Sequence, residues 1–186
     1  MIKEKKGAIL IISGPSGCGK STLLKEVYKD IDDYYFSIST TTRAPRVGET
    51  NGVDYFFVTK EEFEVDIENG DFLEYAKVHD NYYGTLKSEV EKKREEGNTV
   101  LLEIDVQGGL IVKKKDPSAV LVFFKAPDDK ELEGRLRNRG SDSEEIIRKR
   151  LENALKEMEY EKEYDYSIIN ISIDQSYQEL SDIINH

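Results

Sequence analysis

The chain reads Gly14-Pro15-Ser16-Gly17-Cys18-Gly19-Lys20-Ser21, in which two glycines bracket four residues and a lysine and a serine follow. This spacing fits the phosphate-binding loop, in which backbone N–H groups surround phosphate oxygens and the lysine adds a positive charge. The apolar run at 8–12 predicts a short buried parallel strand, and the pattern at 22–28 predicts an amphipathic helix. A glycine-rich turn that binds nothing is the alternative, but a strand before the loop and a helix after it favour a nucleoside triphosphate site. Lys20 would contact the β- and γ-phosphates, and Ser21 would ligate Mg²⁺.

The composition limits the classes of protein that the chain can belong to. Its 186 residues suffice for one α/β domain with a sizeable core. The net charge of -11 disfavours non-specific binding to nucleic acid or to acidic membrane surfaces, and no apolar run approaches membrane-spanning length. Cys18 is the only cysteine, so neither an intrachain disulfide nor a cysteine metal cluster is expected, which fits a reducing cytoplasm. The first residues lead directly into the expected strand, so no signal peptide is expected.

Short apolar runs alternate with helical patterns along most of the chain. The runs lie at 100–105, 119–124 and 166–170, and the helical patterns lie at 87–96, 106–115, 128–138, 143–162 and 175–184. This alternation predicts a parallel sheet with helices on both of its faces.

Two segments depart from the alternation. Residues 35–86 are rich in Tyr, Phe, Thr and Gly, with strand-like pieces at 53–58 and 72–78 around a helical stretch near 60–68. They predict a small mixed α+β insertion. Residues 128–158 are highly charged and are interrupted by a glycine-containing hinge at 139–141, which suits a mobile helical lid. The expected single domain has a core at 1–34, 87–127 and 159–186, an insertion at 35–86 and a lid at 128–158.

Glu103 and Asp105 follow an expected strand and point to one face of it. A carboxylate at the carboxyl end of a parallel strand is where a phosphate-loop enzyme holds the Mg²⁺ shell, although solvated strand-end acids are the alternative.

Arg43 and Arg46 flank Pro45, which forbids a continuing helix, so both arginines are expected on a loop. Two guanidinium groups three residues apart can converge on one phosphate dianion. Taken alone, two surface arginines are the more ordinary interpretation. The tyrosines within 51–55 and 81–85 can donate from their phenol hydroxyls to phosphate oxygens, but tyrosine in a small domain more often packs with its hydroxyl in water, and spacing alone does not decide between the two.

The expected lid carries several cations. Arginines delivered by a closing lid can stabilise the charge on a phosphoryl group in transfer, whereas i,i+4 pairs with glutamates on a solvated helix face are the alternative. The cations are Arg135, Arg137, Arg139, Lys149 and Arg150.

Five segments, in order, carry a resemblance that covers nearly the whole chain. They read ISGPSGCGKST at 12–22, STTTRAPRVGE at 39–49, NGVDYFFV at 51–58, NYYG at 81–84 and EIDVQG at 103–108. Together they closely resemble guanylate kinases, and the block at 39–49 is specific to that family. The resemblance implies a P-loop nucleoside monophosphate kinase fold and a reaction in which ATP, with Mg²⁺, phosphorylates GMP, with dGMP as a further expected acceptor.

The resemblance also implies roles for individual residues. Glu74 matches the carboxylate that reads guanine, because one carboxylate can accept from N1–H and N2–H₂ together and would reject adenine. The expected GMP-binding residues are Ser39, Arg43, Arg46, Tyr55, Glu74, Tyr83, Thr85 and Asp105. The expected ATP-binding residues are Gly14, Pro15, Ser16, Gly17, Cys18, Gly19, Lys20, Ser21, Thr22 and Asn170. The expected catalytic residues are Lys20, Arg43, Arg135, Arg139 and Arg150, and Glu103 would act on Mg²⁺ through water.

Thr85 and Glu103 stand where relatives often carry Ser and Asp, and both keep the functional group. Two alternatives were weighed against this interpretation. One is a kinase of another nucleoside monophosphate or of a phosphorylated ribose, and the other is a non-catalytic scaffold that binds phosphorylated peptides. The sequence leaves open whether the protein is a monomer or a homodimer.

Overall fold

The computed structural model describes residues 7–30, 34–78, 80–138 and 143–185. Five parallel strands form the core sheet in the order β2-β7-β1-β8-β9. Their bounds are β1 Ile9–Ser13, β2 Tyr34–Phe36, β7 Thr99–Glu103, β8 Val120–Lys125 and β9 Tyr166–Ile169. β1 lies at the centre and is buried along its whole length, which is why its sequence is a continuous apolar run.

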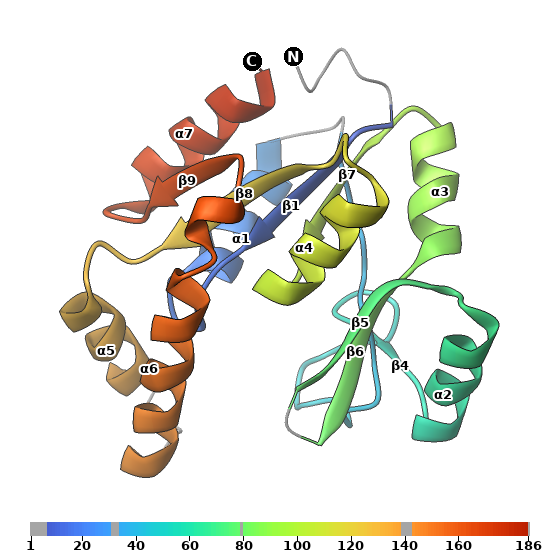
Figure 1. Ribbon diagram of the computed structural model, residues 1–186, viewed down its shortest axis with the longest axis horizontal. Helices are drawn as coiled ribbons and strands as arrows, with labels where there is room; N and C mark the ends of the chain where they lie inside the picture. The colour runs from blue at the N-terminus through green and yellow to red at the C-terminus, as the bar shows by residue number, and fades with distance from the viewer. Residues whose placement is uncertain (1–6, 31–33, 79, 139–142, 186) are drawn as a thin grey trace.

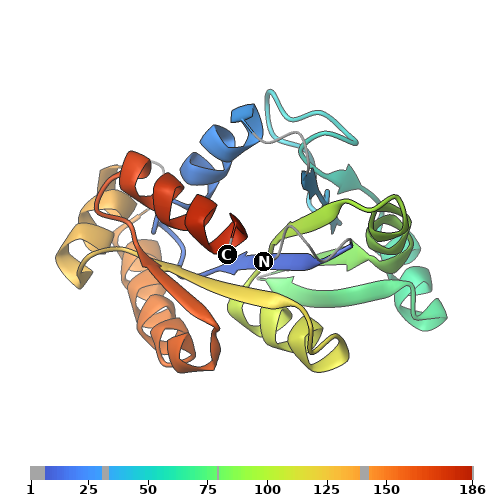
Figure 2. The ribbon, with the colours of Figure 1, turned by 90° about the horizontal axis from the view of Figure 1, so that it is seen from above.

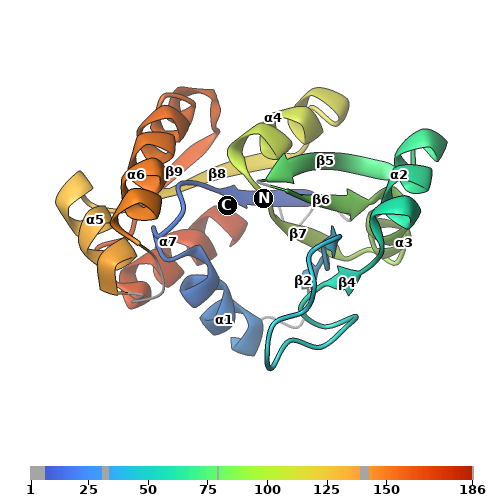
Figure 3. The same cartoon turned by 90° about the horizontal axis from the view of Figure 1, so that it is seen from below.

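Helices cover both faces of this sheet, as Figures 2 and 3 show from opposite sides. On one face, Leu10 and Ile12 of β1 pack with α1 (Lys20–Asp30) and α7 (Ile173–Asn185). On the other face, Ile9 and Ile11 pack with α3 (Lys87–Glu95) and α4 (Val106–Lys115). The alternating side chains of one strand therefore serve two helical layers, and the α/β fold expected from the sequence is confirmed.

A second, smaller sheet lies within the insertion, in the order β4-β3-β6-β5. Its strands are β3 Thr40–Thr41, β4 Phe56–Phe57, β5 Phe72–Val78 and β6 Asn81–Leu86, and α2 covers Lys60–Asn69. The α2 helix begins at a capping box between Thr59 and Glu62. Its buried Phe63 stacks on Phe72 of β5 and on Tyr82 of β6, with ring centroids 4.2 and 5.2 Å apart. These aromatic contacts give the insertion a small core of its own.

The segment expected to form a lid, which we call the lid, consists of α5 (Asp129–Asn138) and α6 (Glu144–Met158), which pack through Leu132, Leu136 and Ile147. Figure 1 shows the lid and the insertion as two separate projections from the lower side of the core. The hinge expected at 139–141 lies outside the described residues. Among the residues that the structure describes, no helix is long and apolar enough to cross a membrane.

Two boundaries differ from those expected. The helix expected over 143–162 ends at Met158, after which a turn and a short 3₁₀ segment at Glu161–Glu163 follow. Neither Gly nor Pro marks this end, so no stop signal is visible in the sequence. Residues 34–36 pair with β7 in the core sheet, so the chain leaves the core slightly later than the boundary expected after residue 34.

Candidate active site

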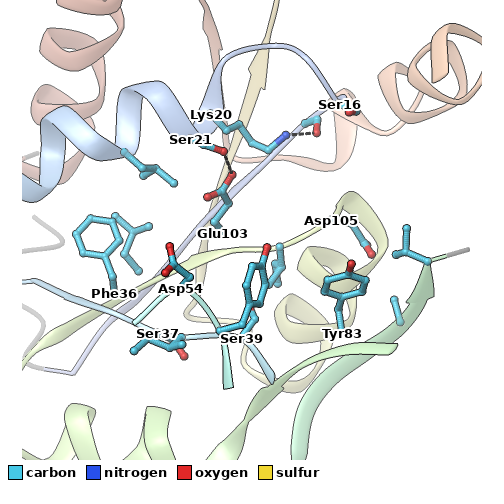
Figure 4. Close-up of a pocket in the computed structure, with 18 of the residues that line it drawn as sticks. Ser16, Lys20, Ser21, Phe36, Ser37, Ser39, Asp54, Tyr83, Glu103 and Asp105 are labelled. Carbon is cyan, nitrogen blue, oxygen red and sulfur yellow. Dashed lines mark hydrogen bonds between the residues drawn. The ribbon is translucent and has the colours of Figure 1, made fainter. Parts of the chain in front are cut away.

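A cavity of about 510 Å³ lies between the glycine-rich loop, the carboxyl ends of β1 and β7, and the insertion. We call it the central cavity, and Figure 4 shows part of its wall. It brings together most of the residues that the sequence selected, although they come from segments far apart in the chain. Those on its wall are Gly14, Ser16, Gly17, Gly19, Lys20, Ser21, Thr22, Ser39, Tyr55, Glu74, Tyr83, Glu103 and Asp105.

The glycine-rich loop owes its path to conformations that favour glycine. Gly14 has a φ of 150°, and a Cβ there would stand 1.9 Å from the carbonyl oxygen of Phe124 on β8. Gly19 has a φ of 102°, and a Cβ there would meet the Asn170 side chain at 2.4 Å. The loop therefore passes close to two neighbouring segments and ends at Lys20, the first residue of α1.

Lys20 lies inside this loop with its ammonium group directed at backbone oxygens. Nζ donates to the carbonyl oxygens of Gly14, at 2.5 Å, and of Pro15, at 3.2 Å. These two oxygens and Cys18 Sγ, at 3.6 Å, all belong to the loop itself, and among the described residues no carboxylate forms a hydrogen bond with the ammonium group. A phosphate could replace these carbonyls with a charge-assisted contact.

Ser21 and Glu103 lie next to each other on the cavity wall and are joined by a hydrogen bond. Ser21 Oγ, on α1, donates to Glu103 Oε1, at the end of β7, over 3.1 Å. A hydroxyl and a carboxylate are oxygen donors that suit Mg²⁺, which keeps several waters and takes further ligands from substrate phosphates. Within the described ranges no three His, Cys, Asp or Glu side chains are grouped to hold a metal by themselves. The donor set therefore fits a magnesium ion that arrives with a nucleotide rather than a closed protein cage.

Asp105, two residues after Glu103, caps a helix. Its carboxylate accepts from the backbone N–H of Gly108 at 2.8 Å and so starts α4. Its backbone oxygen accepts from Ser13 Oγ at 3.3 Å. The side chain is thus fixed on the cavity wall by the first turn of α4.

Glu74 of β5 is the most deeply buried carboxylate of the cavity, with only 5% of the residue exposed. Thr85 Oγ1 on β6 donates to Glu74 Oε1 at 2.7 Å. Burial, together with the charge of Asp105, raises the pKa of Glu74 to about 7, although the bond from Thr85 and the charge of Lys115 oppose the rise. A Cβ on Gly108 would stand 2.8 Å from Glu74 Oε2, so the absence of a side chain there leaves room for the carboxylate.

Arg43 is held by a carboxylate that sequence reasoning did not select as a site residue. Its Nη1 and Nη2 donate to the two carboxylate oxygens of Glu49 at 3.0 and 2.9 Å. The guanidinium lies 5.3 Å from the ring centroid of Tyr55, whose ring meets that of Tyr83 edge to face at 6.0 Å. Arg46 is exposed, and its backbone N–H donates to Glu49 Oε2 at 2.7 Å. Glu49 therefore contacts both of the arginines that are expected to bind the phosphate.

Arg135 and Asn170 contact the far side of the glycine-rich loop. Asn170 Nδ2 donates to the Cys18 carbonyl oxygen at 2.7 Å, and Arg135 Nη1 donates to the same oxygen at 3.0 Å. Arg135 Nη2 also donates to the Asn170 carbonyl oxygen at 3.0 Å. In this structure both side chains contact the loop from outside the cavity. Arg150 is half-buried on α6 away from the cavity wall, and Arg139 lies outside the described residues.

Glu157, near the end of α6, lines the cavity, although no sequence motif predicts it as a site residue. Burial raises the pKa of its carboxyl group, and the charge of Lys20 lowers it. No local pattern could have predicted it, because Glu157 lies 137 residues from Lys20 and within an ordinary charged helix. The lid therefore contributes a carboxylate to the donor end of the cavity.

Comparisons with known proteins agree with this geometry. The family model described as guanylate kinase matches residues 6–186. A guanylate kinase of Fusobacterium nucleatum is 58% identical over 180 residues, covering 97% of each chain. One of Clostridium perfringens is 46% identical, covering 98% of this chain and 84% of the relative.

Solved structures point the same way. The crystal structure of guanylate kinase from Anaplasma phagocytophilum superposes with a TM-score of 0.77 at 32% identity, covering 100% of this chain and 88% of that one. A shikimate kinase from Bacteroides thetaiotaomicron, at 14% identity and a TM-score of 0.52, shares the fold alone. The chain belongs to the guanylate kinase family, the enzymes that phosphorylate GMP with ATP.

Proposed function

We propose that the central cavity is where this chain transfers the γ-phosphoryl group of ATP to GMP, giving ADP and GDP. The observation that carries the proposal is that a single cavity is lined both by the phosphate-binding loop and by the insertion. Lys20 and Ser21 occupy the donor side, and Glu74 and Tyr83 occupy the acceptor side. Such an arrangement can hold two phosphorylated ligands in line.

On the acceptor side, Glu74 would read guanine by accepting from N1–H and N2–H₂, with Ser39, Thr85 and Asp105 completing the contacts to the base. The phosphate of GMP would be held by two guanidinium groups and two phenol hydroxyls. These belong to Arg43, Arg46, Tyr55 and Tyr83. None of the assigned residues has a role toward the ribose 2′-hydroxyl, so we extend the proposal to dGMP.

On the donor side, the backbone of residues 14–19 and the α1 N-terminus would surround the ATP phosphates, together with Lys20 and Thr22. Asn170 would lie near the adenine. Arg135, Arg139 and Arg150 would reach the transferring phosphoryl group after the lid has closed. Arg135 now contacts the Cys18 carbonyl oxygen and would have to exchange that bond for a phosphate oxygen.

Mg²⁺ fits the pair formed by Ser21 and Glu103, the latter acting through water. The ion supplies neutralisation of the phosphate charge. The protein residues bind and orient the two nucleotides, and they exclude water from the cavity. No general base is required, because the attacking GMP phosphate oxygen is already largely ionised near neutral pH. Closure of the insertion and of the lid would remove water and limit hydrolysis of ATP.

We further propose that the enzyme acts in the cytoplasm, as a monomer or homodimer, on these small molecules and not on nucleic acid. The net charge of -11 supports the last point, and the single cysteine fits a reducing compartment.

A coupled assay of ADP release tests the proposed function. GMP, dGMP, AMP, CMP and UMP are offered as acceptors with ATP, with and without a chelator of Mg²⁺. We expect turnover with GMP and dGMP that is lost when the metal is chelated, and little turnover with the other three. Preference for AMP, CMP or UMP would contradict the assigned acceptor side. Absence of ADP release with every acceptor would contradict the phosphoryl-transfer role and favour a scaffold.

A further inference from the structure

The chain passes from the core sheet to the insertion at Ile38. The N–H of Ser37 donates to the carbonyl oxygen of Leu101 on β7 at 3.1 Å, which is a core contact. The carbonyl oxygen of Ser39 accepts from the N–H of Phe56 on β4 at 2.9 Å, which is an insertion contact. Ile38 lies between these two anchors, at one of the places where the insertion is joined to the core.

Glu89 holds Ile38 from the segment where the chain returns to the core. It lies in the first turn of α3, which begins directly after β6 (Figure 1). Its Oε1 accepts from the backbone N–H of Ile38 at 3.1 Å and from the hydroxyl of Tyr35 at 2.6 Å. Tyr35 belongs to β2. One carboxylate therefore joins the last core strand before the insertion, the crossing residue and the first helix after the insertion.

The crossing lies on the acceptor side of the central cavity. Ile38 and Ser39 both line the cavity wall, and Ser39 is an expected contact of the base. A hydrogen bond from a backbone N–H to a carboxylate is charge-assisted and so holds its donor more tightly than a neutral one. Fixing Ile38 in advance reduces the ordering that GMP must impose on this wall.

We propose that Glu89 is a positioning residue for the acceptor, which fixes the crossing at Ile38 and thereby places Ser39 for the base of GMP. This inference rests on the proposed function of the cavity. The donor loop follows β1, and β7 separates β1 from β2 in the sheet. Loss of the Glu89 contact is therefore expected to affect GMP and to leave ATP binding as it is.

Steady-state kinetics of Glu89→Ala, Glu89→Gln and the control Glu95→Ala test the proposal. Glu95 is exposed on the same helix. We expect Glu89→Ala to raise KM for GMP by about threefold to tenfold, the loss of one charge-assisted hydrogen bond, with KM for ATP and kcat within about twofold. Glu89→Gln keeps an oxygen acceptor for Ile38 and should recover most of the difference. Glu95→Ala should match the wild type.

An unchanged KM for GMP in Glu89→Ala would overturn the proposal. Equal rises in the two KM values would do so as well, because they would indicate a general structural role. Where the alanine variant does not fold, Glu89→Asp replaces it, since its carboxylate is one methylene shorter and withdraws from Ile38. The same rise in KM for GMP is then expected, and its absence counts against the proposal. A wild-type enzyme inactive toward GMP would contradict the proposed function instead.

Discussion

The guanidinium of Arg43 is bound on two nitrogens by the carboxylate of Glu49, six residues further along the same loop. These nitrogens are the donors that the phosphate of GMP is expected to use. Their bond to Glu49 also lowers the pKa of the carboxyl group, so it stays charged at neutral pH. The acceptor phosphate must therefore share Arg43 with an internal anion or displace it.

We expect Glu49→Gln to lower KM for GMP without changing KM for ATP. The amide keeps an oxygen for the N–H of Arg46 but removes a negative charge from the position beside the incoming dianion. Both partners are partly exposed, and pairs of this kind contribute little to binding or stability, so the expected change is at most about fivefold. Glu61→Gln on the exposed side of α2 serves as the control. A higher KM for GMP would show instead that Glu49 orients Arg43 for the phosphate.

Lys20→Met is expected to remove most turnover while GMP still binds. The ammonium group is fixed in the loop by the carbonyl oxygens of Gly14 and Pro15, on the donor side of the cavity. The Lys20 ammonium group is a preorganised donor to the negative charge that develops in the transition state. Loss of such a donor lowers kcat by about a hundredfold or more. Turnover is measured by ADP release and GMP binding by calorimetry, with Lys25→Met on the exposed face of α1 as the control. Normal turnover in Lys20→Met would disprove the transfer role.

The sequence predicted the local geometry of the glycine-rich loop better than the contacts between segments that lie far apart in the chain. The glycine-rich loop is a local device, so the spacing of Gly14, Gly19 and Lys20 is enough to predict its conformation. Glu49 and Glu157 act through contacts that the chain makes only after folding, and in sequence each looks like an ordinary solvated acid. Tertiary contacts decide what a charged residue does, and periodicity does not report them.

The same reason explains a strand that was not expected. β3 has two residues, which is too short for a period of two to show. It forms because Thr40 and Thr41 pair with strands on both sides, one of which, β4, lies within the strand-like piece expected at 53–58. Four of the five core strands, β1, β7, β8 and β9, were expected as short apolar runs, and there the prediction of a parallel sheet was confirmed.

Glu74→Gln is expected to stabilise the nucleotide-free protein at alkaline pH. Burial raises the pKa of Glu74 to about 7, above its ordinary value of 4.5 in an unfolded chain, so folding holds a proton that the unfolded chain releases. The stability contribution is fully present below the unfolded pKa and is lost as pH rises through 7. The cost of the ionised, buried carboxylate at pH 8 is about 3 kcal/mol.

Urea unfolding at pH 5 and at pH 8 measures this effect. The glutamine variant should exceed the wild type by up to about 3 kcal/mol at pH 8 and by much less at pH 5, because the wild-type carboxyl is then protonated. Glu91→Gln, on the exposed face of α3, should show no such difference between the two pH values. An equal effect of Glu74→Gln at both pH values would mean that packing, and not charge, separates the variants.

The protonation of Glu74 should also set the choice of base. The carboxylate can accept from both N1–H and N2–H₂ of guanine, whereas the protonated acid turns one oxygen into a donor, which suits the N1 acceptor of adenine. With the pKa of Glu74 at about 7, the ionised fraction falls about tenfold between pH 8 and pH 6, and KM for GMP should rise correspondingly. The phosphate of GMP titrates near pH 6 too, so Glu74→Gln, which keeps that titration and lacks the carboxyl group, is the matched control. We expect the ratio of AMP to GMP turnover to increase toward pH 6 in the wild type and to be independent of pH in the variant. A constant ratio in the wild type would show that Glu74 does not read the base through its charge.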